Sequence, residues 1–419
     1  MTKSVEIDTL KNSTWQEKLL VIASAMMVVV LILKDQIIPP FILLFVLSTI
    51  LFWKGNKLLR SKKVVFPLMF LFILYAIMFC FAGNKAQGIF LLTTKLSFLI
   101  FPIIALGLSS GVKFASFGLK WGFILGSGFS MLFAFFRAVI TEGGFSGEAF
   151  HANVYGVNMH PSYLALIFIF ACALLVTDKS TSKVIKYGKW AFLALTVVSM
   201  FYLRSLGAFV CVAAIFGTLP IWKMLKTRNW KWLLTLPVYC IIFFVGLKSS
   251  PRITNDVTAS VHSTAVWAES PSEFIANNVN NIESNTVRLV VWTVAADMIV
   301  RNPFGVGTGD ENDLLIREYY KHGYTGYAER RLNPHQQFLQ TGISIGWLGI
   351  FTLIALFVFL VIEAYKTENL ALFIGAICIS VSCLFESMLE RQVGVIFLSI
   401  LVFYIAITRF QQAKIEAQK

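Results

Sequence analysis

One histidine lies where a polar stretch meets a long apolar run, in the sequence Asn333-Pro334-His335-Gln336. Asn is a preferred N-cap residue and Pro is favoured at the first helical position, so the sequence predicts a helix that starts at Pro334 with His335 in its first turn. Gln336 is expected to complete a capping box with Asn333. The positive end of a helix disfavours imidazolium, and a neutral imidazole can accept a proton. His335 is therefore a candidate general base; the alternative is a surface histidine at a membrane interface.

Two arginines lie in apolar surroundings where a phosphate could be their partner. Arg204 lies in a very short turn between two apolar runs. It either snorkels along its aliphatic stem to the interface or binds a phosphate with its guanidinium. Arg288 and Trp292 are four residues apart, so we expect them on one face of a helix. Arg288 needs a partner there, which is either a carboxylate of the protein or an anionic ligand.

Further charged or titratable residues lie in or beside apolar runs. Lys95 is inside one, and a lysine within a membrane span usually faces the bundle interior or a wet cavity. Glu386, Glu390 and Arg391 crowd one turn, where they form either a structural ion network or a ligand site. His160 opens another apolar run and is interpreted first as part of a structural entry motif, with a role in the site as the alternative.

No cofactor or metal site is predicted. The glycines at 305, 307 and 309 follow no strand and precede no Gly-Lys-Ser/Thr, so this stretch is interpreted as a helix stop and a tight turn rather than a nucleotide loop. The six cysteines lie in apolar runs without the spacing of a zinc site or a disulfide framework. No cluster of His and carboxylate has metal-ligand spacing.

The elements that position these residues are expected to be membrane-spanning helices. Of the 419 residues, 57% are hydrophobic and only 14% are charged, and the mean hydropathy is +0.74. A soluble domain is nearer one quarter charged, so lipid must be the solvent for much of this chain. The net charge of +14 is concentrated in short loops between apolar runs. Membrane orientation explains it, and nucleic acid is not an expected partner.

Twelve apolar runs have about the length of a membrane span. They lie near 18–34, 37–53, 64–82, 88–109, 115–139, 161–177, 187–203, 205–222, 232–248, 340–363, 369–386 and 392–409. Lys and Arg cluster in every second connecting loop and in the C-terminal tail. The positive-inside rule then predicts that both termini are cytoplasmic.

The segment between the ninth and tenth runs is the largest external one and is slightly acidic. It contains one mostly apolar stretch, 287–300, expected to form an interfacial or re-entrant helix. The sequence thus predicts an all-α polytopic membrane protein with about 12 spans and three parts. These are spans one to nine (1–248), a periplasmic loop with short helices (249–333), and spans ten to twelve with a cytoplasmic tail (334–419).

The order of these pieces resembles the O-antigen ligase and polymerase superfamily. The motifs that carry the resemblance are the 204–207 turn, Arg288 with Trp292, the 302–307 stretch, and the run from Asn333 into the glycines at 342, 346 and 349. The family turn usually has Gly directly after Arg-Ser, whereas Leu206 intervenes here.

The resemblance implies an enzyme of the bacterial inner membrane with a periplasmic site. It would transfer a glycan from an undecaprenyl-diphosphate carrier to an acceptor hydroxyl, in contact with membrane lipids and without metal or cofactor. The family histidine, here His335, would activate the acceptor. Arginines, here Arg204 and Arg288 with Lys95 as a helper, would bind the diphosphate, and Arg252 and Arg391 are candidates for a third arginine.

Three functions remain open from the sequence. The first is an O-antigen ligase with lipid A–core as acceptor. The second is a polymerase or a protein O-oligosaccharyltransferase, which differ from the ligase only in the acceptor. The third is a non-catalytic transporter of lipid or glycan. Transporters place broken helices and charges at the bilayer midplane, whereas most distinctive charges here lie at the outer boundary, which favours the enzyme.

Overall fold

The computed structural model describes residues 12–53, 62–108, 110–142, 159–178, 183–203, 205–249, 251–279, 281 and 284–417. Within these residues every regular element is a helix, and strand-type pairing is limited to one isolated bridge between Trp53 and Leu108. Eight helical segments in the described part of the chain are long and apolar enough to cross a membrane. The prediction of an all-α polytopic membrane protein is therefore confirmed.

The eight long segments and three shorter apolar helices cover eleven of the predicted spans. The long ones are α2 (Trp15–Leu33), α4 (Lys62–Phe81), α5 with α6 (Lys85–Lys95, Ser97–Gly107), α7 (Val112–Glu142), α11 (Leu206–Thr227), η2 with α12 (Trp230–Thr235, Leu236–Lys248), α18 (Gln337–Lys366) and α20 (Gln392–Glu416). The shorter ones are α3 (Pro39–Ile50), α9 (Pro161–Val176) and α19 (Leu370–Phe385). The remaining predicted span, 187–203, lies in α10 (Lys183–Leu203), whose first half carries three lysines.

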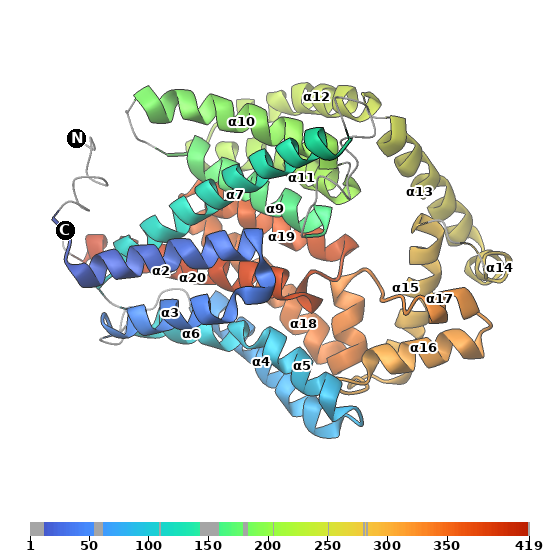
Figure 1. The fold of residues 1–419 in the computed structure, drawn as a ribbon. Helices are drawn as coiled ribbons and strands as arrows, with labels where there is room; N and C mark the ends of the chain where they lie inside the picture. The colour runs from blue at the N-terminus through green and yellow to red at the C-terminus, as the bar shows by residue number, and fades with distance from the viewer. Residues whose placement is uncertain are drawn as a thin grey trace.

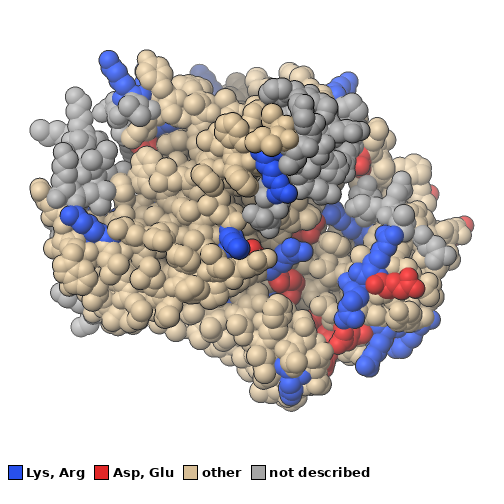
Figure 2. All heavy atoms as spheres, in the orientation of Figure 1, with Lys and Arg blue, Asp and Glu red and all other residues tan. Residues whose placement is uncertain are grey.

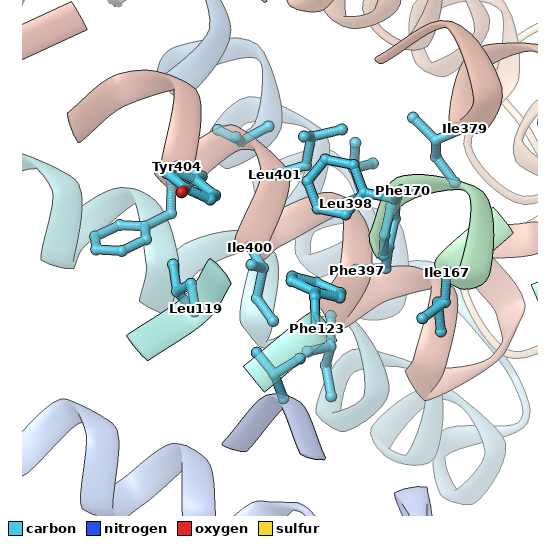
Figure 3. Close-up of a cluster of buried hydrophobic side chains, with 14 of the residues drawn as sticks. Leu119, Phe123, Ile167, Phe170, Ile379, Phe397, Leu398, Ile400, Leu401 and Tyr404 are labelled. Atoms are coloured by element: carbon cyan, nitrogen blue, oxygen red, sulfur yellow. The ribbon is translucent and has the colours of Figure 1, made fainter. Parts of the chain in front are cut away.

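Helix α20 is the centre of the bundle and is buried along most of its length. Phe397 of α20 meets Phe170 of α9 and Phe123 of α7 edge to face, with ring centroids 5.5 and 5.9 Å from Phe397 (Figure 3). Such aromatic contacts add to the stabilisation that comes from apolar burial. The tightly packed centre fixes the N-terminal end of α20 and the turn that precedes it.

The segment predicted as one external loop contains five helices. They are α13 (Pro251–Glu269), α14 (Pro271–Asn277), α15 (Ser284–Arg301), α16 (Glu311–Lys321) and α17 (Thr325–Glu329). They lie at the opposite end of the molecule from the start of α2 and the end of α20 (Figure 1). Charged side chains gather over this end and are sparse on the rest of the face shown in Figure 2.

Helix α15 contains the apolar stretch expected at 287–300 and forms a second hydrophobic core. Val290 and Ala295 of α15 are fully buried, as is Tyr319 of α16. The apolar residues of α15 thus pack largely against the neighbouring helices of the α13–α17 segment and against the start of α18.

A glycine-rich strap joins α15 to α16 and packs against a break in α18. The chain of α18 leaves helical geometry at Gly346, which has φ +70°. The Val306 N–H donates to the Ile343 carbonyl over 2.8 Å. Gly305 has φ +87°, and a Cβ there would lie 2.5 Å from the Ser344 carbonyl oxygen. The stretch is a helix stop and turn, as predicted, and it leaves no room for side chains where it crosses α18.

Candidate functional site

The predicted helix start around His335 is wrong. Helix α18 begins at Gln337, and His335 precedes it in the left-handed region with φ +47°. The Asn333 side-chain oxygen accepts the His335 backbone N–H over 3.0 Å, and the Pro334 carbonyl accepts the Trp292 indole N–H over 2.7 Å. These two contacts hold the chain before Gln337 in a non-helical conformation. Gln336 is the N-cap instead of a capping-box partner, and its side chain accepts the N–H of Leu339.

The imidazole of His335 contacts the carboxylate of Glu386. His335 Nδ1 lies 3.3 Å from Glu386 Oε2, and Arg288 Nη2 lies 3.1 Å from Glu386 Oε1. A proton on Nδ1 that is donated to Glu386 leaves Nε2 as the proton acceptor of a neutral ring. The His335 side chain is 37% exposed, so a substrate hydroxyl can reach the ring. The sequence placed Glu386 in a crowded polar turn but gave no sign that it is the partner of His335.

Glu386 is held in its ionised form. Burial raises the pKa of its carboxyl, but the hydrogen bond with His335 and the charges of His335 and Arg288 lower it by more. The net pKa therefore lies below the usual value of a glutamate, and the carboxylate persists at neutral pH. A permanent negative charge can both orient an imidazole and stabilise the imidazolium formed during proton transfer.

Arg288 and Trp292 lie on one face of α15, and both act on the histidine segment. Trp292 binds the carbonyl that precedes His335, and Arg288 binds the carboxylate that faces its ring. Of the two partners considered for Arg288, the structure shows a carboxylate of the protein. A guanidinium carries five N–H groups, and the Arg288 side chain is 22% exposed, so it can also bind an anionic ligand.

His160 and Arg391 lie at the same place. Burial of the His160 imidazole lowers its pKa, and it is close enough to four charged or titratable groups for them to alter that pKa further: Glu386, Arg391, His335 and Arg288. His160 also has the local role expected of an entry motif, because its Nδ1 accepts the Ser162 N–H as the N-cap of α9.

Arg391 is the N-cap residue of α20, and its side chain is exposed. Within the described part of the chain its guanidinium has no hydrogen bond or ion pair. The cation therefore remains available to a ligand, at a helix N-terminus, where anions are favoured.

Lys95 is fully buried and faces the protein. Its ammonium binds both oxygens of Glu390 at 3.1 Å. Gln337, the first residue of α18, donates to Glu390 and accepts the Leu389 N–H over 2.6 Å. Gln336 N–H donates to Ser387 Oγ over 3.2 Å. These contacts fasten the 386–390 turn to the start of α18, so Lys95 supports the contact between Glu386 and His335 from behind.

Two predicted arginines are outside what the structure describes: residue 204, and the side chain of residue 252. The residue after Arg204 is described. Ser205 caps α11, and its Oγ lies 3.4 Å from Ser162 Oγ, two residues from His160. The turn that carries the predicted phosphate-binding motif thus reaches the start of α9.

The described residues hold no group of three or more His, Cys, Asp or Glu side chains that could bind a metal ion. The charged groups gathered here are instead two cations and one carboxylate around an imidazole. This arrangement can accept a proton from a hydroxyl and can bind an anion a short distance away.

Comparison with known protein families bears on this site. The family described as O-Antigen ligase matches residues 191–354. The matched region runs from α10 through α11–α17 into α18 and contains Arg288 and His335. These residues are therefore similar to the O-antigen ligase family, and the resemblance seen in the sequence is confirmed. Comparison with curated proteins gave no match.

Proposed function

We propose that the chain is a glycosyltransferase that moves a glycan from an undecaprenyl-diphosphate carrier to an acceptor hydroxyl. The family supports ligase-type glycan transfer in a multi-pass membrane protein. The observation that carries the proposal is the chain of contacts from Arg288 through Glu386 to His335. It joins a proton acceptor, its orienting carboxylate and a cation within one site.

His335 Nε2 accepts the proton of the acceptor hydroxyl as its oxygen attacks the anomeric carbon of the donor. The bond from that carbon to the diphosphate oxygen breaks, and the leaving group departs as undecaprenyl diphosphate. A single displacement of this kind inverts the anomeric centre. Glu386 stabilises the imidazolium until its proton passes to solvent.

Arg288 and Arg391 are the cations that we expect to stabilise the departing diphosphate. Charge that develops on leaving oxygens is stabilised best by donors already in place. Arg391 offers an exposed guanidinium, and Arg288 offers the N–H groups that Glu386 does not use. Arg204 stays a proposed third member. We propose that Lys95 supports the site indirectly, through its ion pair with Glu390, and does not itself bind the diphosphate. We propose no metal and no cofactor, because the arginines take the role that a divalent ion has in other diphosphate sites.

The arrangement of the helices supports a periplasmic site in a bacterial inner membrane. The start of α2 and the end of α20 lie at one end of the molecule and the external helices at the other (Figure 1). In the sequence, lysines and arginines cluster in every second connecting loop and in the C-terminal tail, as expected for cytoplasmic segments. Both termini would then be cytoplasmic, and His335 would face the periplasm.

Lipid A–core is the acceptor we propose first, with a growing glycan or a protein side chain as the alternatives. The envelope of a deletion strain distinguishes them. A ligase leaves lipid-linked glycan and no long-chain lipopolysaccharide, a polymerase leaves single-repeat lipopolysaccharide, and a protein-glycosylating enzyme leaves unglycosylated proteins. An unchanged envelope with impaired lipid export would favour a transporter instead.

The decisive experiment is His335→Ala in a single-turnover transfer assay with purified donor and acceptor. General-base assistance contributes about 10²–10⁴ in rate, so transfer should fall by that factor while the thermal melt is unchanged. His322→Ala is a matched control, because His322 is an exposed histidine of the same external segment that lies near Glu318. Full activity of the His335→Ala variant would refute the proposed base.

A further inference from the structure

An apolar groove lies between α3 and the α5–α6 segment, on the part of the bundle that faces lipid. Its volume is about 710 Å³, within the range of about 300–1,000 Å³ that is usual for ligand pockets. The walls are mostly aliphatic: Pro39, Ile42, Leu43, Val46, Thr49, Ile50, Trp53, Thr93, Leu96, Ser97, Ile100, Ile103, Ile104 and Gln392. The two helical segments run side by side in Figure 1. A groove of twelve helical residues is roughly 18 Å long at the usual rise per residue.

Two hydroxyls inside the groove, those of Thr49 and Thr93, are satisfied within their own helices. The hydroxyl of Thr49 donates to the Val46 carbonyl over 2.6 Å, and that of Thr93 donates to the Ile89 carbonyl over 2.8 Å. The groove therefore offers a ligand aliphatic contact and little hydrogen bonding. A hydrocarbon chain has the matching chemistry.

Trp53 of the chain after α3 and Leu108 of the chain after α6 lie together at one end of the groove. Trp53 lines this end, and its backbone pairs with that of Leu108. The ring of Trp53 lies so close to Gly107 that a Cβ there would be 2.3 Å from it.

The other end of the groove opens at the candidate site. Gln392 lines the groove there, and the preceding residue is Arg391, with its exposed guanidinium. The charge of Arg391 is close enough to His160 and Asp35 to lower the pKa of each side chain. The groove thus leads from Trp53 toward the exposed cation of Arg391, which lies near the imidazole and carboxylate of the site.

We infer that this groove binds the polyprenyl chain of the lipid-linked donor, with the diphosphate at Arg391. The inference rests on the proposed function, because it assigns the tail of the donor for that reaction. The positive charge at the mouth complements an anionic head group, and the aliphatic walls complement the chain. An acyl chain of a bilayer phospholipid is the competing occupant, and the experiment below separates the two.

The test is photocrosslinking of the full-length protein with a polyprenyl diphosphate that carries a benzophenone on its chain. Crosslinked peptides should come from α3 and α6, and unlabelled polyprenyl diphosphate should compete. Leu43→Trp with Ile103→Trp should fill the groove from both walls and reduce crosslinking at least 10-fold. These side chains are 58% and 40% exposed, so the larger ring is tolerated. Leu47→Trp is the matched control, because Leu47 is 53% exposed on the same helix but does not line the groove.

Transfer should show the same pattern. With a long-chain donor the double variant should raise KM at least 10-fold, whereas with a ten-carbon diphosphate donor it should match the wild type. Crosslinks outside α3 and α6, or crosslinks that a phospholipid competes away equally well, would overturn the inference. Specific crosslinking in the groove without any glycan transfer would instead refute the proposed function and leave the groove assignment intact.

Discussion

Replacement of Glu386 by Gln tests whether this carboxylate acts through His335. The amide keeps the volume of the side chain and an oxygen that can accept a proton from Nδ1, but it removes the charge. The carboxylate is 18% exposed and lies 3.3 Å from the imidazole. A hydrogen bond to a charged group contributes about 1.5–3 kcal/mol, and partial exposure places this one near the lower end of that range. A loss of about 1.5–2 kcal/mol in the transition state corresponds to about a 10- to 30-fold slower transfer.

The assay is single-turnover transfer from purified lipid-linked donor, with kcat and KM measured separately under steady state. The fall should be in kcat, because Glu386 stabilises the imidazolium that forms only during reaction. KM should stay the same or decrease, because Arg288 loses its partner and can bind the diphosphate with more of its N–H groups. A purely structural role would lower the melting temperature without this division between kcat and KM.

The double variant of Glu386→Gln with His335→Ala makes the test sharper. If Glu386 acts only through His335, the double variant should be no slower than His335→Ala alone, since residues that act as a unit are not additive. Additive losses would mean that Glu386 has a separate role. Activity equal to wild type in the single Glu386→Gln variant would refute the proposed pairing.

Four further outcomes follow from the same geometry. Arg288→Lys should lose most of its transfer activity, because an ammonium cannot bind Glu386 and a diphosphate as a planar fork does; an active Lys variant would contradict this. Burial of the Glu311 carboxyl raises its pKa to about 7. Between about pH 4.5 and 7 the folded state therefore keeps a proton that the unfolded state has released. The free energy of unfolding should fall by about 3 kcal/mol as the pH rises through this range. Melting curves of Glu311→Gln against pH should lack that fall. Ser260→Cys, in a background without Cys80 and Cys240, should react with an impermeant thiol reagent added outside the cell, whereas Thr227→Cys should not; the reverse result would overturn the orientation. Transfer should continue in EDTA, and loss of activity that magnesium restores would show that a metal is needed.

The membrane-spanning helices could be located from the sequence because their signal is local. About twenty consecutive apolar residues cannot be solvated by water, and the charges beside them are in neighbouring loops. The helix face shared by Arg288 and Trp292 was predictable for a similar reason, since residues four apart on a helix always lie on one side. His335 could be chosen from its residue type and its place before an apolar run.

The start of α18 could not be located in this way. Asn333 and Pro334 have the composition of a helix start, but the indole of Trp292 binds the Pro334 carbonyl across 42 positions of the chain. That one tertiary hydrogen bond outweighs a local preference of about one kcal/mol. The result is a histidine in the left-handed region, aimed by the chain that precedes the helix rather than by the helix itself.

The partners of the site residues were also decided by the tertiary structure alone. Glu386 follows His335 by 51 residues, and Glu390 follows Lys95 by 295 residues. A lysine inside an apolar run is expected to pair with a carboxylate, and so is a histidine that acts as a base. The sequence does not show which acidic residue lies near either of them. The packing of α18, α19 and α20 brings the 386–390 turn against His335, and this contact gives the proposed base a carboxylate partner.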